Sequence, residues 1–206
     1  LVSSQGGDAF ALTNSDTYSQ TPIWSPDSQS IAFTSDRYGK GDVFIVPSMG
    51  GKALRLTYHA SLDVPYAFSA DGKQVYFRSA RLGDSQANLM AGYGGNQADQ
   101  LYAVSALGGR EKLVLPIPVS SLSVSSDGQQ FLYTDWPSYE QEWRKRTTSD
   151  AARDIWQFDL TTGKHTQLTH FEGEDRNAVW ADTQSMYYLS ERSGSFNVWK
   201  KDLLDG

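Results

Sequence analysis

The chain has 206 residues, of which 39% are hydrophobic and 13% aromatic, and its formal net charge at pH 7 is −6. This length allows one sizeable core or two small ones, and the apolar content argues against a disordered chain. The acidic balance, with no long basic run, excludes a typical duplex nucleic-acid binder. The absence of cysteine excludes disulfides and cysteine-ligated zinc, and no apolar run approaches the roughly 18 residues that span a membrane.

One pattern recurs four times along the chain. Its copies begin 44, 56 and 56 residues apart: IWSPDSQSIAFTSDR at Ile23, AFSADGKQVYFRSAR at Ala67, SVSSDGQQFLYTDWP at Ser123 and VWADTQSMYYLSERS at Val179. A second pattern follows each copy: DVFIVPSMGGKALRLT from Asp42, QLYAVSALGGREKLVL from Gln100, DIWQFDLTTGKHTQLT from Asp154 and NVWKKDLLDG from Asn197. The first residues, LVSSQGGDAFALT, align with this second pattern. We therefore divide residues 1–206 into repeats of approximately 1–13 (partial), 14–57, 58–115, 116–169 and 170–206 (partial).

Each repeat is predicted to form four short strands, named a to d in chain order. In the first complete repeat these are residues 22–25, 30–36, 42–48 and 53–57, with period-two alternation in strand b. Asp-Gly pairs at 71–72 and 127–128 mark the a–b turn, and Gly-Gly pairs at 50–51 and 108–109 mark the c–d turn, because such pairs tolerate the positive φ of tight hairpins. Ser28 and Thr183 replace the turn glycine in two repeats, so we expect turns of another type, or longer turns, there.

Four-stranded units of this length predict an all-β fold, a β-propeller of four-stranded antiparallel blades. The chain holds about four blade equivalents, which we interpret as an arc of a larger six- or seven-bladed ring with exposed edge strands near both ends. We expect that these exposed edge strands allow the chain to associate with another chain. Asp27, which stands beside Ser25 and Ser28 as in a hydrolase or cation site, is most simply a turn-capping residue because its surroundings recur in each repeat.

The SPDG-type turn, the IAF-type strand, the D-V-F or D-I-W strand, the GG turn and the closing R-L-T resemble the PD40 repeat of TolB-like, WD40-like propellers. The stretches EWRKRTTSDAARDIWQFDL, HTQLTHFEGEDRNAVW and YYLSERSGSFNVW are most similar to the N-terminal propeller of tricorn-like serine peptidases of the S41 type. This resemblance implies a non-catalytic propeller that guides or filters peptides towards a serine protease domain elsewhere in a periplasmic or secreted parent chain. A TolB-like periplasmic scaffold that binds a partner protein, and the propeller of a prolyl-oligopeptidase-type enzyme, remain alternatives.

No catalytic centre, metal site or cofactor site is predicted within these residues. No G-x-S-x-G elbow surrounds a serine, and His59, His165 and His170 lack the HExxH spacing of zinc ligands. His59 and His170 follow strand d at equivalent positions, where we interpret them as loop residues.

Two b–c connections are long, residues 80–99 and 135–153, and in a propeller the b–c and d–a loops lie on one face. We expect a peptide- or partner-binding surface there. The 135–153 insertion supplies Tyr139, Trp143, Arg144 and Arg146, where cations beside an aromatic ring could clamp a carboxylate, although a solvated loop is an equally simple reading. The acidic d–a loop, residues 170–177, supplies His170, Glu174, Asp175 and Arg176.

Overall fold

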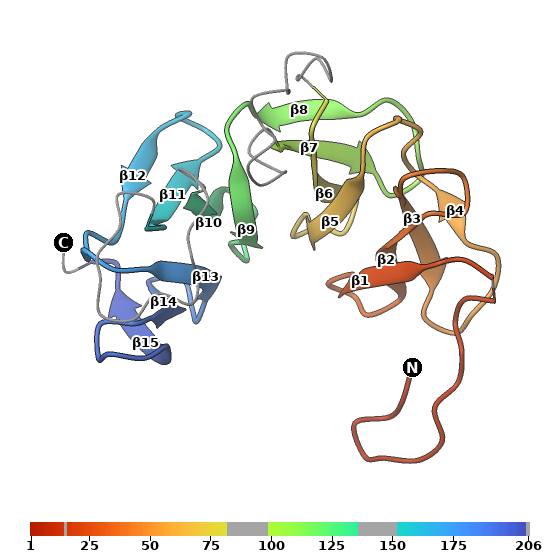
Figure 1. Ribbon diagram of the computed structural model, residues 1–206, viewed down its shortest axis with the longest axis horizontal. Coiled ribbons are helices and arrows are strands. Elements are labelled where there is room, and N and C mark those ends of the chain that lie inside the picture. The colour runs from red at the N-terminus through yellow and green to blue at the C-terminus, as the bar shows by residue number, and fades with distance from the viewer. Residues whose placement is uncertain (15, 82–98, 136–151, 205–206) are drawn as a thin grey trace. The chain divides into compact units, whose positions relative to one another are not determined.

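A computed structural model describes residues 1–14, 16–81, 99–135 and 152–204 of the chain. These residues form strands and no helix, and the strands assemble into four antiparallel sheets (Figure 1). Each sheet joins strands that are consecutive in the chain, as the four-strand repeat predicts. The all-β fold of antiparallel propeller blades is therefore confirmed.

The strands a to d of each repeat map onto the sheets in order. The first sheet contains β1 (Ser19–Trp24), β2 (Ser30–Ser35), β3 (Asp42–Pro47) and β4 (Leu54–Arg55). The second contains β5 (Asp63–Phe68), β6 (Gln74–Ser79), β7 (Gln100–Ser105) and β8 (Lys112–Leu115). The third contains β9 (Val119–Val124), β10 (Gln130–Asp135), β11 (Ile155–Asp159) and β12 (His165–Gln167). The last contains β13 (Asp175–Trp180), β14 (Ser185–Ser190) and β15 (Asn197–Asp202), which matches the partial repeat predicted for residues 170–206.

The chain divides into two compact units, residues 1–79 with 102–113 and residues 80–101 with 114–206. In the first unit, one face of β2 and β3 packs against one face of β6 and β7. The period-two alternation of the strands selects the residues of this core, which are Ala32, Val43, Leu56, Phe68, Val75, Phe77, Tyr102 and Val104. The second unit repeats the arrangement between the β9–β12 and β13–β15 sheets, with Leu132, Ile155, Ala178, Met186 and Tyr188 buried together.

The other face of β2 and β3 packs against the N-terminal segment. Leu1 and Leu12 lie against the buried side chains of Ile31, Phe33, Phe44 and Val46. The backbone N–H of Phe10 donates to the carbonyl oxygen of Leu1 at 2.8 Å, and the Leu1 amino group donates to the carbonyl oxygen of Phe10 at 2.7 Å. This hairpin-like pairing is what the alignment of residues 1–13 with a c–d hairpin predicts, although no strand is assigned there.

The a–b turns correct one expectation. Ser28 has φ 59°, close to the φ 71° of Gly72 and the φ 72° of Gly128. Ser28, Gly72 and Gly128 each donate their backbone N–H to the carbonyl oxygen three residues earlier at 2.9 Å. The Ser28 turn is thus the same turn as the glycine turns, and the expectation of another type was wrong there because the surrounding hydrogen bonds offset the strain of a left-handed serine. The Thr183 turn does differ, but it is shorter rather than longer: four residues, 181–184, connect its strands, whereas five, 25–29, connect β1 to β2.

Within the described ranges, no helix is both long and apolar enough to cross a membrane.

Candidate functional site

The serines and aspartates of the repeated pattern are turn residues. The Ser25 hydroxyl donates to Asp27 Oδ1 at 2.6 Å, and the backbone N–H groups of Gln29 and Ser30 donate to Asp27 Oδ1 (3.0 Å) and Ser25 Oγ (2.9 Å). The same three bonds recur in the turns that contain Ser69 and Asp71, and Ser125 and Asp127. The turn-capping interpretation of Asp27 is therefore confirmed.

These hydrogen bonds also control the charge of the aspartates. The serine hydroxyl is the largest influence in each turn, and it lowers the pKa of Asp27, Asp71 and Asp127. For Asp71 the pKa falls to about 2, with further help from the backbone N–H and the ammonium group of Lys73. A carboxylate held in this state is a weak proton acceptor at neutral pH.

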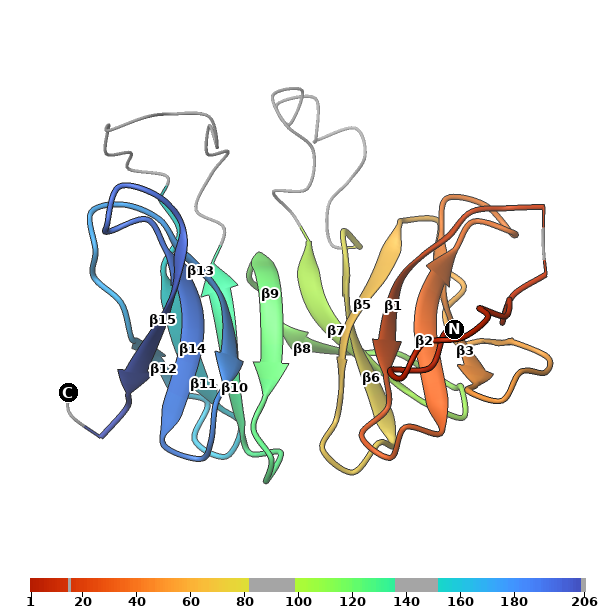
Figure 2. The same cartoon turned by 90° about the horizontal axis from the view of Figure 1, so that it is seen from below.

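The d–a loop and the b–c loop meet at one end of the last sheet (Figure 2). The backbone N–H of Glu174 donates to Glu191 Oε1 at 2.8 Å, and the Glu191 N–H donates to the Glu174 carbonyl oxygen at 3.3 Å. The d–a loop that ends at Glu174 and the b–c loop, residues 191–196, therefore share a face of this sheet, as the propeller geometry predicts.

Two of the carboxylates in this loop region, those of Glu174 and Asp175, are buried rather than presented to solvent. The side chain of Glu174 is 2% exposed, and its Oε1 lies 3.2 Å from Arg153 Nη1 and 3.3 Å from Arg176 Nη1. Asp175 is fully buried, and its Oδ2 lies 2.9 Å from Arg192 Nη2. Burial raises the pKa of Asp175, even though Ser190 and Arg192 favour its ionised form.

Among the other predicted site residues, Arg176 also lies 4.3 Å from the centre of the Phe196 ring, which leaves its guanidinium partly buried between an acid and an aromatic ring. His59 and His170 are exposed loop residues, as expected. The predicted residues Tyr139, Trp143, Arg144 and Arg146 lie outside the described residues.

His170 lines a pocket of about 490 Å³ in the second unit. Its other lining residues are Leu168, Thr169, Phe171, Tyr188, Arg192, Trp199, Lys200 and Lys201. The Arg192 guanidinium lies 5.2–5.4 Å from the ring centres of Phe171, Tyr188 and Trp199. Because Tyr188 pairs with Trp199 and Met186 with Lys201, the side chain of Lys201 lies on the same sheet face as the two rings. Cations beside aromatic rings suit a ligand with a carboxylate and an apolar body.

Sequence reasoning missed Arg192 and Lys201 as members of this site. The signal that could have found Arg192 is the repeated Ser-x-Arg at the end of strand b, at residues 35–37, 79–81 and 190–192. Lys201 carries no repeated signal, since its role follows from its register opposite Met186.

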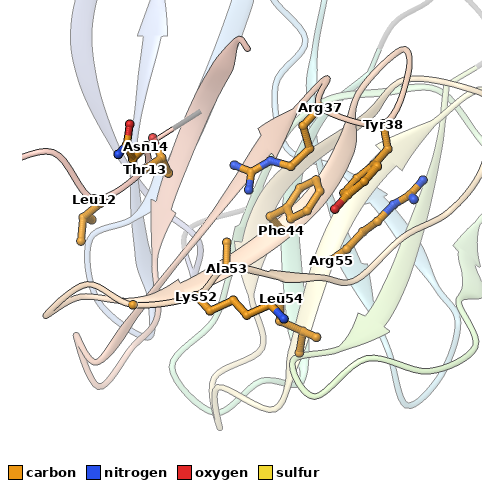
Figure 3. A pocket seen from close by; sticks show the side chains of 11 residues that line it. Leu12, Thr13, Asn14, Arg37, Tyr38, Phe44, Lys52, Ala53, Leu54 and Arg55 are labelled. Atoms are coloured by element: carbon orange, nitrogen blue, oxygen red, sulfur yellow. The ribbon is translucent and has the colours of Figure 1, made fainter. Parts of the chain in front are cut away.

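A second pocket, of about 470 Å³, lies at the equivalent position in the first unit (Figure 3). Here Leu12, Thr13 and Asn14 correspond to residues 168–170, Arg37 to Arg192, and Phe44 to Trp199. The guanidinium of Arg37 lies 4.5 Å from the ring centre of Phe44, and Tyr38 stacks on the same ring with centres 6.1 Å apart. Lys52 and Arg55 complete its cationic wall.

In the ranges that the structure describes, no three histidine, aspartate or glutamate side chains gather as they would around a metal ion.

Solved structures share this fold at low sequence identity. TolB from Acinetobacter baumannii matches 100% of this chain and 46% of its own, with a TM-score of 0.74 and 18% identity. A putative TolB from Agrobacterium tumefaciens matches 93% of this chain and 61% of its own, with a TM-score of 0.67 and 20% identity. The β-propeller domain of the Trilobed protease from Pyrococcus furiosus matches 84% of this chain and 48% of its own, with a TM-score of 0.53 and 13% identity. The chain thus spans about half of the length of these proteins, and identities this low establish the fold alone.

None of the proteins with curated functions matches the chain in sequence. The family model of the tricorn protease N-terminal β-propeller domain matches residues 1–206, that is, every residue of the chain, and the chain therefore belongs to this family.

Proposed function

We propose that the chain is a non-catalytic propeller that guides or filters peptides for a tricorn-like serine peptidase, and that peptides contact the loop face of its second unit. Membership in a protease propeller family supports the peptidase context. The observation that carries the peptide contact is the pocket lined by His170, Arg192, Trp199 and Lys201, because it joins cationic and aromatic groups beside the meeting point of two loops.

The cations of this pocket differ in whether a carboxylate of the chain already lies close to them. Arg192 is paired with Asp175 at 2.9 Å, and Lys200 lies 3.9 Å from Asp182. Lys201, on the aromatic face of the sheet, is therefore the cation that we expect to contact a peptide carboxylate. The rings of Tyr188 and Trp199 offer a surface for an apolar peptide side chain.

The inserted b–c connection of the third sheet contributes further groups to this proposal. Tyr139, Trp143, Arg144 and Arg146 belong to the connection that follows β10 in the sequence, and they lie outside the described residues. Two arginines beside a tryptophan are suited to bidentate contact with a peptide carboxylate.

The test is a titration of the chain with an acidic peptide and with the same peptide in which the carboxylates are amides. Replacing Arg144 and Arg146 together with Ala should weaken binding of the acidic peptide by about 1–3 kcal/mol, as for charge-assisted hydrogen bonds. Lys201→Gln should weaken it in the same direction. Lys164→Gln is the matched control, since Lys164 is an exposed cation in the c–d turn at the other end of β12. Equal affinity for both peptides, or a loss that the control shares, would contradict the proposal.

A TolB-like scaffold that binds a partner protein is the second candidate. The observation in its favour is β15, which pairs with β14 along its length and exposes 70% of Val198 in the last sheet. A partner could add a strand at this edge. Val198→Lys would then reduce partner capture while leaving acidic-peptide binding unchanged. We also propose a periplasmic or secreted location, which fractionation of cells that carry the parent gene would check.

A further inference from the structure

The end of strand b carries the same arginine in the first and the last sheets. Arg37 Nε donates to Ser35 Oγ at 3.1 Å, and Arg192 Nε donates to Ser190 Oγ at 2.8 Å. Each guanidinium lies over the aromatic ring of the adjacent strand c, Phe44 at 4.5 Å and Trp199 at 5.2 Å. The two arginines are thus held in the same way by serine and ring.

Arg37 and Arg192 differ in the hydrogen-bond acceptor that is available to the Nη2 atom of the guanidinium. Arg192 Nη2 lies 2.9 Å from the carboxylate of Asp175, the first residue of β13, which pairs with Ser190. In the first sheet the corresponding residue, the first of β1 and the partner of Ser35, is Ser19. Arg37 Nη2 is buried and has no hydrogen-bond partner among the described residues.

A buried guanidinium nitrogen without an acceptor is unfavourable, because it has lost its water without gaining a replacement. A ligand that enters from solvent can supply the missing acceptor, since Arg37 lines the pocket of about 470 Å³ (Figure 3). None of the residues that line this pocket is acidic. Arg55 is neutralised by Asp42 at 2.9 Å, so the uncompensated positive charge in the pocket comes from Arg37 and Lys52.

We propose that this pocket binds the carboxylate of an organic ligand, which takes the place at Arg37 that the Asp175 carboxylate occupies at Arg192. A carboxylate is favoured over other anions because it is the acceptor that the repeat itself supplies at this position, and its two oxygens match the planar fork of arginine. The stacked rings of Tyr38 and Phe44 accommodate the apolar body of the ligand. The carboxylate belongs either to a small organic acid or to an acidic side chain of a peptide.

Benzoate and N-acetylglutamate amide represent these two sources, with benzamide as the uncharged match of benzoate. Binding is followed by the NMR signal of the Arg37 Nε–H group in the 206-residue chain. We expect both carboxylates, but not benzamide, to shift this signal in a saturable manner. The tighter binder of the two identifies the source, and either order supports the site. Stronger binding of inorganic phosphate than of both carboxylates, or no saturable shift with any probe, would overturn the proposal.

Two substitutions make the test specific. Ser19→Asp supplies the missing carboxylate internally at an exposed position and should lower the affinity for benzoate at least tenfold, although Arg37 is retained. Lys40→Gln, which removes an exposed cation of the same b–c loop that does not line the pocket, should leave the affinity within twofold. A circular dichroism melt checks that both variants are folded. Unchanged benzoate affinity in a folded Ser19→Asp variant would exclude Arg37 as the receptor. This proposal does not depend on peptide binding at the second unit, because its signal arises in the first.

Discussion

At the scale of single residues, hydroxyl and carboxylate groups are used to close turns. In three sheets a serine hydroxyl bridges an aspartate and a backbone N–H, and in the last sheet the Ser185 hydroxyl donates to Asp182 Oδ2 at 2.6 Å. The aspartate is the acceptor for the N–H groups that a tight turn would otherwise leave unpaired. This role requires its ionised form, which makes it sensitive to acid.

The first prediction concerns Asp71, whose pKa in the folded chain is about 2, below its ordinary value of 3.8. A carboxylate with a depressed folded-state pKa adds stability that is fully present above the unfolded pKa and is lost as pH falls towards the folded pKa. Asp71→Asn should therefore be less stable than the parent chain above pH 4, and this difference should disappear between pH 4 and pH 2. Urea unfolding at a series of pH values measures it, and a difference that is independent of pH would show that the charge of Asp71 has no part in the turn.

The second prediction concerns Glu174, which is buried between Arg153 and Arg176. Glu174→Ala leaves the Arg153 guanidinium, 8% exposed, without this counter-charge. The free energy of unfolding should fall by about 3–5 kcal/mol, the usual cost of breaking a buried ion pair by removing one partner.

Glu172 provides the control for this substitution because it lies in the same loop and is exposed. Glu172→Ala should change the free energy of unfolding by less than about 0.5 kcal/mol. Chemical denaturation of both variants decides the matter, and similar losses would mean that burial of Glu174 contributes nothing specific.

The sequence predicts the role of the turn aspartates but not the burial of the two carboxylates in the d–a loop region. The role of Asp27 follows from its repeated neighbours, because a local turn is specified by residues adjacent in the chain. The burial of Glu174 and Asp175 does not follow, because their partners Arg153 and Arg192 lie 17 or more residues away and the loop alone looks like an exposed acidic segment. Long-range pairing of this kind is decided by the packing of whole strands.

At the scale of elements, the threonine of the closing Leu-Thr hydrogen-bonds the end of strand d to strand c. Thr57 Oγ1 accepts the backbone N–H of Val43 at 2.9 Å, and Thr169 Oγ1 accepts that of Ile155, also at 2.9 Å. Both threonines are buried at the point where strand d ends. Their hydroxyls satisfy a strand-c donor beyond the last backbone pair, which explains why β4 and β12 suffice although they are short.

The third prediction tests this hydrogen bond by replacing Thr57 with Val, which preserves the shape of the side chain. The N–H of Val43 would then be buried without its acceptor, and the free energy of unfolding should fall by about 1–3 kcal/mol. Thr166→Val, at an exposed position of β12, should cost less than about 0.5 kcal/mol. Hydrogen exchange of the Val43 amide adds a local measure, and an unchanged exchange rate in Thr57→Val would contradict the role of the hydroxyl.

Strand positions were predictable because the hydrophobic alternation and the turn residues agree in every repeat. Strand a of the first sheet nevertheless starts at Ser19 rather than at residue 22, since a register shift between Gln20 and Ile23 accommodates Thr21 at φ 51°. A bulge of this kind interrupts the period-two pattern that locates strands in a sequence. The same shift occurs between Arg176 and Val179, where Asn177 has φ 55°. Its repetition shows that it belongs to the repeat.

At the scale of the whole molecule, the fourth prediction is that the purified chain hydrolyses neither peptides nor peptide esters. A serine nucleophile needs a neighbouring base that accepts its proton near neutral pH. The carboxylates beside Ser25, Ser69 and Ser125 have lowered pKa values, and the same hydroxyls accept backbone N–H groups, so proton transfer to these carboxylates is unfavourable. Assays with fluorogenic peptide esters should give rates equal to those of a heat-denatured sample. Turnover that Ser25→Ala or Ser125→Ala abolishes, in a variant that remains folded, would show instead that one of these turns is a catalytic centre.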